Sequence, residues 1–291
     1  MTRPTSPSER LRELLSHGSL IRAPSAIDGL SAKLIAKAGF EAIHLTGSGV
    51  SRSMGYPDIG LVTMSEMVER ARMVSNAVSV PVIADGDTGY GNAMNLMRTI
   101  REFEAAGVAA IHVEDQITPK RCGHYDGKEL IAAEEMALKI QAACEARRDR
   151  AFIVVARTDA RGIEGFDAAI RRANLYRDAG ADVVFIEAPE SREEVERIPS
   201  LVAAPVLINM YSGGKTPLIS TADLRAWGYS IVVWPSHLQR ASILAMQRAL
   251  ELLKKEDVSA ADDPTLMVSF AEREELVGIE EIQALERRFL K

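Results

Sequence analysis

The sequence predicts an α/β protein in which eight parallel strands close into a (β/α)8 TIM-type barrel. Three observations lead to this fold class: a phrase that repeats along the chain, apolar runs that suit buried strands, and a length of 291 residues. That length by itself suits either two domains of about 150 residues or one barrel of about 250 residues. Eight strand–helix units followed by a tail account for the chain as one barrel.

The repeated phrase is a helical stretch that ends at Ala-Gly or a close variant, followed by an extended apolar run and then by polar residues. Its four copies are AKAGFEAIHLTG, EAAGVAAIHVED, RDAGADVVFIEA and RAWGYSIVVWPS. Glycine just after a helix supplies the left-handed residue that ends it, here Gly39, Gly107, Gly180 and Gly228. The runs of Ile, Val and Phe without strict alternation are typical of parallel strands covered on both faces.

Four further strands complete the predicted barrel. In VPVIADGD and APVLINM, Pro81 and Pro205 stand at the strand start, where a missing N–H does no harm. Another strand lies in FIVVARTD, and the weakest lies near residues 19–24. Helical patterns separate the strands, and this alternation indicates a parallel sheet with helical crossovers. An open doubly wound sheet would place a glycine-rich phosphate loop after the first strand, but the residues there are APSAIDGLSAKL.

We predict a catalytic barrel over residues 1–256 and a helical extension over residues 257–291. The segment IEEIQALERRFLK near the end of the chain has the apolar stripe of a helix. Two placements remain open for it: packed on the outside of its own barrel, or exchanged with a neighbouring subunit.

Composition excludes several classes of function. Lys and Arg number 35 against 41 Asp and Glu, a net charge of −6, which argues against nucleic-acid binding. The apolar runs fall well short of the roughly 20 residues that a membrane span needs, and the opening MTRPTSPSERLRELLS has no apolar core of a secretory signal. Cys122 and Cys144 are too few for a disulfide scaffold and fit a reducing compartment. We therefore expect a cytoplasmic enzyme, with Cys144 in the core.

Polar side chains gather where the predicted strands end, which is the face that carries chemistry in barrels of this kind. Asp85 and Asp87 would point the same way on a regular strand, and Glu114 on the next strand would complete a carboxylate cluster suited to a hard divalent cation. The alternative is that these acids cap helices or pair with arginines. Arg157 across the mouth would either neutralise the acids or bind a substrate carboxylate.

The segment PKRCGHYDGKEL follows the fourth predicted strand. Its Cys122 stands beside two cations and His124, an environment that favours the thiolate and makes a cysteine reactive. The alternative is a flexible surface loop in which the cysteine is incidental. In the segment TGSG, after the second strand, backbone amides could hold a carboxylate.

Seven motifs taken together resemble the isocitrate lyase/phosphoenolpyruvate mutase superfamily, from about residue 21 to the tail. They are TGSGVSRSMGYPDIG, ADGDTGYG, HVEDQ, PKRCGH, ARTDA, IEAP and NMYSGGKTP. Lys-Arg-Cys-Gly-His is the signature of the lyase branch, and within it the chain is similar to short-chain lyases of the methylisocitrate and dimethylmalate type.

The resemblance implies a Mg²⁺ ion, with Mn²⁺ as the alternative, bound directly by Asp85 and through water by Asp58, Asp87 and Glu114. It implies a set of groups that grip the acid end of the substrate: Thr46, Gly47, Ser48, Arg157 and Asn209. Glu187 and His124 would support the site, and Cys122 would be the general acid on a loop that closes over it. Family members are similar in being homotetramers that exchange the C-terminal helix.

Two positions depart from the family pattern. Methylisocitrate lyases carry a tyrosine where this chain has His44, and a Thr-Glu pair where it has Tyr211-Ser212. Loss of the glutamate removes a polar contact near the distal end of the substrate, which favours a malate-type diacid over a tricarboxylate. His44 would be either the catalytic base, since imidazole titrates near neutrality, or a packing residue.

The predicted activity is Mg²⁺-dependent cleavage of a carbon–carbon bond in a 2-hydroxy di- or tricarboxylate, such as a 2-alkylmalate or a methylisocitrate-like acid. The products would be an α-keto acid such as pyruvate and a second carboxylic acid. Two alternatives use the same scaffold: an oxaloacetate decarboxylase and a carboxyphosphonoenolpyruvate-type phosphonomutase. A third, from another class, is a catalytically silent barrel that binds a keto acid.

Overall fold

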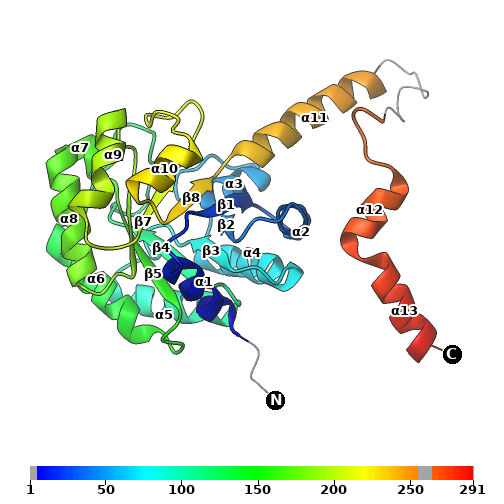
Figure 1. Cartoon of the computed structure of the whole chain (residues 1–291), viewed down its shortest axis with the longest axis horizontal. Helices are drawn as coiled ribbons and strands as arrows, with labels where there is room; N and C mark the ends of the chain where they lie inside the picture. Colours follow the sequence, from blue (N-terminus) through cyan, green and yellow to red (C-terminus); the bar gives the residue numbers. More distant parts are fainter. Residues whose placement is uncertain (1–4, 255–263, 291) are drawn as a thin grey trace.

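A closed barrel of eight parallel strands forms the body of the protein (Figure 1). The computed structural model describes residues 5–254 and 264–290. The strands are joined in the order of the chain, and β1 closes the ring against β8 through the pairing of Ile21 with Ile231. The predicted (β/α)8 fold is confirmed.

Each strand lies within one of the eight segments that the sequence singles out, except that the first is shifted and ends two residues beyond the expected segment 19–24. The strands are β1 Ile21–Ala26, β2 Ile43–Leu45, β3 Val82–Asp85, β4 Ala110–Glu114, β5 Ile153–Thr158, β6 Val183–Ile186, β7 Val206–Asn209 and β8 Ile231–Trp234. Their apolar side chains fill both the barrel interior, where Ile83 and Phe185 lie, and the layer beneath the helices, where Ile111 and Val184 lie. Burial on both faces explains why these runs do not alternate.

Helices follow the strands around the outside of the barrel. They are α1 Pro7–Ser16, α2 Gly29–Lys37, α3 Gly47–Ser53, α4 Met64–Ala77, α5 Ala93–Ala105, α6 Ala133–Ala146, α7 Arg161–Glu164, α8 Phe166–Asp178, α9 Arg192–Leu201, α10 Thr221–Trp227, α11 His237–Leu253, α12 Phe270–Val277 and α13 Ile279–Phe289. The glycines predicted to end helices, Gly39, Gly107, Gly180 and Gly228, all have positive φ.

Helix α1 was not among the predicted elements, although its sequence signal is clear. The Ser6 side chain accepts a hydrogen bond from the Glu9 backbone N–H, and the Glu9 carboxylate accepts one from the Ser6 backbone N–H, with Pro7 between them at the first turn. The helix closes the end of the barrel where the strands begin, because Leu11 is fully buried among interior residues such as Ile21.

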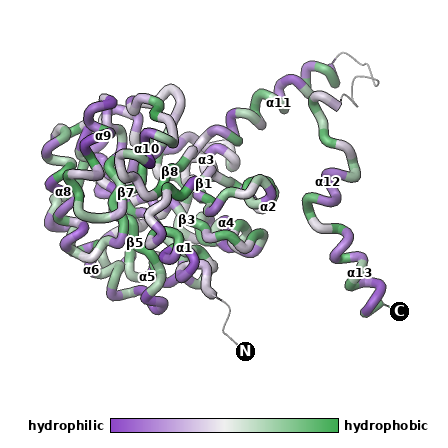
Figure 2. Tube along the Cα trace, in the orientation of Figure 1, coloured by the Kyte–Doolittle hydropathy of each residue, from purple (hydrophilic) through white to green (hydrophobic). Residues whose placement is uncertain are grey.

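The C-terminal helices stand apart from the barrel (Figures 1 and 2). Helix α11 forms where expected but buries none of its residues: its start contacts the barrel at Gly49, and the rest extends away from it. Helix α12 touches α2 through an ion pair of 2.8 Å between Lys37 and Glu275. Subunit exchange of the tail stays a prediction, and the predicted boundary at residues 256–257 lies outside the described residues. Over the described residues, no helix is long and apolar enough to span a membrane.

Candidate active site

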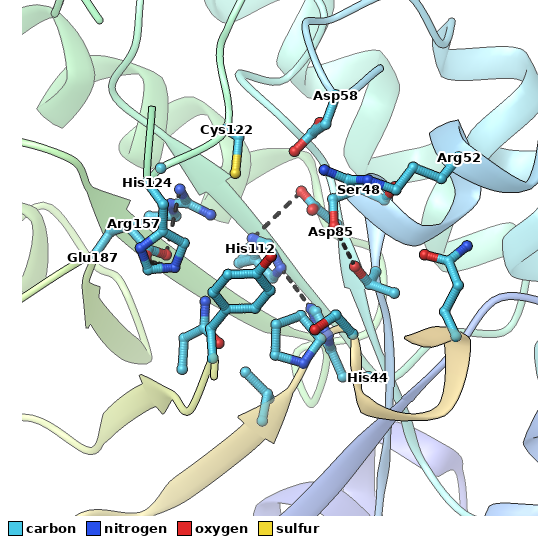
Figure 3. A pocket seen from close by; sticks show the side chains of 18 of the residues that line it. His44, Ser48, Arg52, Asp58, Asp85, His112, Cys122, His124, Arg157 and Glu187 are labelled. Carbon is cyan, nitrogen blue, oxygen red and sulfur yellow. Dashed lines mark hydrogen bonds and ion pairs between the residues drawn. The ribbon is translucent and has the colours of Figure 1, made fainter. Parts of the chain in front are cut away.

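A cavity of about 280 Å³ opens at the ends of the strands, and Figure 3 shows its lining. Polar and charged groups from β2, β3, β4 and β5 form its inner part, and loops and α11 form its rim. Most of the predicted site residues line it: His44, Thr46, Ser48, Asp58, Asp85, Cys122, His124, Arg157, Glu187 and Asn209. Gly47, Asp87 and Glu114 do not line the cavity. They lie next to it and contact Asp85 or Arg157, which line it.

Asp85 ends β3 and is the best-held carboxylate of the site. Its Oδ2 accepts a hydrogen bond of 3.1 Å from the Gly47 backbone and its Oδ1 one of 3.0 Å from the Asp87 backbone. A Cβ at Gly47 would lie 2.7 Å from Oδ2, so only glycine permits this approach. The carboxylate that the TGSG backbone holds is therefore Asp85 itself, and not a ligand. Burial opposes ionisation, yet the neighbouring His112, Lys120 and Arg157 outweigh it and lower the pKa of Asp85.

The expectation that Asp87 and Asp85 point the same way on a regular strand does not hold. The strand stops at Asp85, and Asp87 has φ of 45°, a left-handed conformation in which strand alternation does not apply. Lys120 Nζ lies 3.0 Å from Asp87 and 2.6 Å from Asp58, joining the two acids. Burial raises the pKa of Asp87 to about 6 despite this lysine.

Arg157 is surrounded by carboxylates, which favours the neutralising role among the two left open by the sequence. Its Nε lies 2.9 Å from Asp159 and 3.2 Å from Glu114, and its Nη2 lies 3.3 Å from Glu187. Glu114 and Arg157 face each other in register on β4 and β5. Burial raises the pKa of Glu114 well above its usual range, and its Oε1 has no hydrogen-bond partner.

The charge balance of the site fits a divalent cation. Among residues 5–254 and 264–290, seven buried carboxylates at this end of the barrel face five buried cations. The carboxylates are Asp58, Asp85, Asp87, Glu114, Asp115, Asp159 and Glu187, and the cations are Lys120, Lys128, Lys139, Arg157 and Arg172. In that same part of the chain no three acid, histidine or cysteine side chains converge as a full metal shell would require. The arrangement suits an ion with one direct protein ligand and several water-bridged ones, as predicted for Asp85 and its neighbours.

A pair of buried histidines supports Asp85 from below. The Nε2 atoms of His44 and His112 lie 3.0 Å apart, Ser25 Oγ lies 2.7 Å from His44 Nδ1, and His112 Nδ1 lies 3.6 Å from Asp85 Oδ1. Burial and the neighbouring ring lower the pKa of His44 to about 3, and burial lowers the pKa of His112. Both rings are therefore neutral, and one Nε2 must donate to the other.

Only one direction of that hydrogen bond suits the carboxylate. If His44 donates, His112 carries its proton on Nδ1 and presents it to Asp85; the reverse arrangement would place a lone pair against the carboxylate. Since both nitrogens of His44 are engaged inside the barrel, the structure does not support a role as base. It favours the alternative, that His44 is a packing residue, with the added task of orienting His112.

The cysteine loop lies closed over the cavity. Gly123 packs so tightly on Arg157 and Glu187 that a Cβ would lie 2.5 Å from each side chain. Lys128 Nζ donates to the Gly123 carbonyl and lies 3.0 Å from Asp159, and His124 stacks on Tyr211 with ring centroids 4.9 Å apart. The loop is thus anchored to the barrel and to the segment after β7, and is not a free surface loop.

The expectation that Cys122 favours its thiolate is wrong. Burial, Asp58 and Glu187 raise the pKa of Cys122 to about 11. The basic residue expected to stabilise the anion, Lys120, instead pairs with Asp58 and Asp87. The thiol therefore keeps its proton, which suits a proton donor and not a nucleophile.

Sequence reasoning left four contributors unassigned. His112 and Lys120 have signals, since one lies in β4 opposite Asp85 in register and the other stands two residues before Cys122. Arg52 on α3 and Arg240 on α11 also line the cavity; Arg52 lies within the motif TGSGVSRSMGYPDIG, and Arg240 lies in none of the seven motifs.

A closed (β/α)8 barrel with buried carboxylates and an anchored cysteine loop at its strand ends is the architecture of an enzyme that acts on small molecules. The phosphoenolpyruvate phosphomutase family matches residues 11–254. The chain is 47% identical over 281 residues to 2,3-dimethylmalate lyase of Eubacterium barkeri, covering 96% of this chain and 97% of the relative. It is 47% identical over 250 residues to 2-methylisocitrate lyase of Aeropyrum pernix, covering 86% and 80%.

Solved structures agree with these relatives. The crystal structure of 2,3-dimethylmalate lyase, a PEP mutase/isocitrate lyase superfamily member, superposes with a TM-score of 0.92 at 36% identity, covering 98% of this chain and 96% of that one. Phosphonopyruvate hydrolase in complex with oxalate and Mg²⁺ superposes with a TM-score of 0.90 at 34% identity, covering 98% and 100%. The chain belongs to the PEP mutase/isocitrate lyase superfamily, and the resemblance carried by its motifs is confirmed.

Proposed function

We propose that this protein is a Mg²⁺-dependent carbon–carbon lyase that cleaves a 2-alkylmalate, such as 2,3-dimethylmalate, into pyruvate or a close α-keto acid and a second carboxylic acid. The observation that carries the proposal is the Cys122 thiol, which points into the cavity from the closed loop, with the Asp85 carboxylate on the cavity wall (Figure 3). A lyase of this kind needs both a metal site and a group that donates a proton to carbon.

The metal would be held by Asp85 directly and by Asp58, Asp87 and Glu114 through water, with Mn²⁺ as the alternative ion. When bound, it lowers the pKa of the substrate hydroxyl and stabilises the developing carbonyl oxygen. Its presence in the neighbouring phosphonopyruvate hydrolase supports this assignment.

The side chains supply binding and proton transfer. Thr46, Ser48 and Asn209 line the cavity and would grip the acid end of the substrate, and Asn209 Oδ1 has no partner of its own. Loss of the hydroxyl proton allows the C2–C3 bond to break, so that C2 becomes a carbonyl and C3 keeps the electron pair. Cys122 then delivers its proton to C3 and is reprotonated afterwards, so the net change is transfer of one proton from oxygen to carbon.

The loop and the cavity walls favour a small alkylated diacid. His124 lies 3.5 Å from Glu187, and these two residues would hold the loop closed and exclude water while the carbanion exists. Phe185, Val233 and Pro235 give the cavity an apolar wall that suits an alkyl substituent.

A panel assay tests the proposal. Alkylmalates, methylisocitrate, isocitrate and oxaloacetate are supplied with and without Mg²⁺, and the α-keto acid formed is reduced in a coupled assay. Mg²⁺-dependent release from an alkylmalate is the expected result. Phosphorus–carbon bond formation seen by ³¹P NMR would instead identify a phosphonomutase, and CO₂ release from oxaloacetate alone would identify a decarboxylase. Binding without turnover of any substrate would identify a silent barrel.

We also propose a cytoplasmic homotetramer in which the C-terminal helices, as a separate extension after residue 256, are exchanged between subunits. Two free cysteines support the reducing location. An apolar groove of about 550 Å³ lies between α2 and the start of α11, with Leu34 and Trp234 in its lining, and the exposed apolar residues of α11 to α13 would need such a surface. Sedimentation of the full chain should give the mass of four subunits, and a monomer would contradict the proposal.

A further inference from the structure

The cysteine loop, residues 117–129, is a compact unit with a narrow neck. Gln116 and Leu130, on either side of it, form an isolated antiparallel bridge. The Gln116 side chain turns into the loop, where it donates to the Arg121 carbonyl at 2.8 Å and accepts from the Arg121 N–H at 2.9 Å. Close ends and internal hydrogen bonds are typical of a loop that keeps its own shape. Its position over the cavity therefore depends on what ties it to the barrel.

Two buried lysines tie the loop to the barrel, one in each limb. Lys120, in the limb that leads to the cysteine, lies 2.6 Å from Asp58 and 3.0 Å from Asp87. Lys128, in the limb that returns, has a side chain that is 3% exposed, and its Nζ lies 3.0 Å from Oδ1 of Asp159. The two acids beside Lys120 belong to the proposed metal site, whereas the proposed mechanism leaves the pair at Lys128 without a role.

Asp159 gives Lys128 a fixed point of attachment. It is fully buried just after β5, and its backbone N–H donates to the Asp115 carboxylate at 2.9 Å. Its two carboxylate oxygens accept from Nε of Arg157 at 2.9 Å and from Nη2 at 3.2 Å. Arg157 and Lys128 thus share one carboxylate, and loss of either cation leaves a buried charge partly unpaired.

The same ammonium group reaches back to the residue that follows Cys122. Lys128 Nζ donates to the Gly123 carbonyl. Gly123 in turn lies so close to Arg157 and Glu187 that a Cβ would meet each side chain at 2.5 Å. Figure 3 shows the Cys122 thiol directed into the cavity from this point of the loop. A small shift of the returning limb would therefore break a close contact and move the thiol.

Contacts at the outer side of the loop are weaker or serve the histidine. Lys215 Nζ lies 3.0 Å from Asp126, whose side chain is 94% exposed, so water screens the pair. His124 stacks on Tyr211, and its Nδ1 accepts from the Lys215 N–H at 3.3 Å. These contacts orient the imidazole ring, whereas the carbonyl before it is held by Lys128.

We propose that Lys128 is a positioning residue that fixes the returning limb of the cysteine loop to Asp159 and so keeps the Cys122 thiol over the cavity. The inference rests on the proposed lyase function in one respect, that this thiol donates a proton to C3. A donor must stand close to the carbon when the C2–C3 bond breaks, and a displacement of about 1 Å is enough to lower a rate about 100-fold. Lys128 acts through the loop and contacts neither the substrate nor the metal.

Labelling of the two free cysteines by iodoacetamide tests the proposal without substrate or metal. Cys144 on α6, whose Sγ lies 3.2 Å from the Gly180 carbonyl, is the internal reference, because mass spectrometry separates the two labelled peptides. Lys128→Met should raise the labelling rate of Cys122 about tenfold, as loss of a hydrogen bond from a charged group does, and should change that of Cys144 less than twofold. An unchanged rate at Cys122, or an equal rise at both cysteines, would overturn the proposal.

A matched control removes the exposed lysine that pairs with the same loop. Lys215→Met breaks the contact with Asp126 and should raise the labelling rate of Cys122 less than twofold, because an exposed ion pair contributes little. A rise as large as that of Lys128→Met would mean that any weakened contact of the loop frees the thiol, and the specific role of Lys128 would be rejected.

A double-mutant cycle covers the case in which Lys128→Met leaves Asp159 unpaired and lowers stability. Asp159→Asn keeps an acceptor for Arg157 but removes the charge that binds Lys128, so it should raise the labelling rate of Cys122 by a similar factor. The double variant Lys128→Met/Asp159→Asn leaves neither charge unpaired and should be labelled no faster than the faster single variant. Effects that multiply in the double variant would show that the two residues act separately, contrary to the proposal.

The outcome is independent of the lyase assay. Faster labelling of Cys122 in Lys128→Met, without turnover of any acid in the substrate panel by the unmodified protein, would retain the positioning role and reject the lyase. Turnover of an alkylmalate by the unmodified protein, with Cys122 labelling that Lys128→Met leaves unchanged, would retain the lyase and reject the positioning role.

Discussion

The two ends of the barrel are built from the same eight strands and differ in what they bury. Where the strands begin, α1 closes the barrel with Leu11, which is fully buried among aliphatic side chains such as Ile153 and Ile231. Where they end, the same strands bury Asp85, Glu114 and other charged groups that hold each other in place.

The end where the strands begin therefore contributes mainly to folding stability, and the end where they stop carries the groups for catalysis. Apolar burial at the start of the strands contributes directly to folding, whereas a buried charge is costly unless it is paired. Buried carboxylates that outnumber the buried cations around them lower the stability of the chain unless a further cation joins them. Substitutions at the two ends should therefore change different measurements.

The largest effect on activity is expected for a substitution in the cavity where the strands end. Cys122→Ser should lower kcat about 10²- to 10⁴-fold, because serine is a much weaker acid than the thiol that protonates C3. The melting temperature should stay within a degree or two, since the substitution is nearly isosteric. Full turnover by this variant would remove Cys122 from the mechanism.

At the opposite end, Leu11→Ala should cost about 2–5 kcal/mol of unfolding free energy, because it opens a cavity where α1 closes the barrel. Urea denaturation measures the loss. The kcat of the remaining folded enzyme should be unchanged, and a variant with normal stability but low kcat would contradict the separation of the two ends.

Substitutions of His44 test whether its hydrogen bond to His112 contributes to metal binding at Asp85. His44→Phe removes the donor to His112 and should weaken Mg²⁺ binding about tenfold, while His44→Gln, which can still donate, should recover most of the affinity. ¹⁵N NMR of the unmodified protein should show His112 protonated on Nδ1 and His44 on Nε2. The opposite tautomers would contradict the proposed direction of the hydrogen bond.

The smallest effect is expected for a half-exposed ion pair near the start of the strands. Arg22→Met breaks the 2.8 Å contact with Glu41 and should cost about 0.2–1 kcal/mol of unfolding free energy, because water screens such pairs. Neither kcat nor Mg²⁺ affinity should change. A loss as large as that of Leu11→Ala would mean that charge also carries stability at this end.

Local patterns in the sequence specify the barrel and which residues lie at the ends of its strands. Glycines such as Gly107 must follow helices because they adopt a positive φ, and runs such as AAIHVE are too apolar to lie anywhere but in a covered strand. Parallel strands end on one face, so Asp85, Glu114 and Arg157 had to come close together.

Only the tertiary structure decides how these groups share charge. Lys120 pairs with Asp58, which lies 62 residues away in the chain, and not with Cys122. Burial and the same Asp58 raise the pKa of Cys122, so the thiol keeps its proton, contrary to the expected thiolate. The Gly47 amide binds Asp85, and His44 meets His112 across the barrel. Hydrogen bonds and ion pairs act over a few ångströms, so they depend on positions that local sequence patterns do not define.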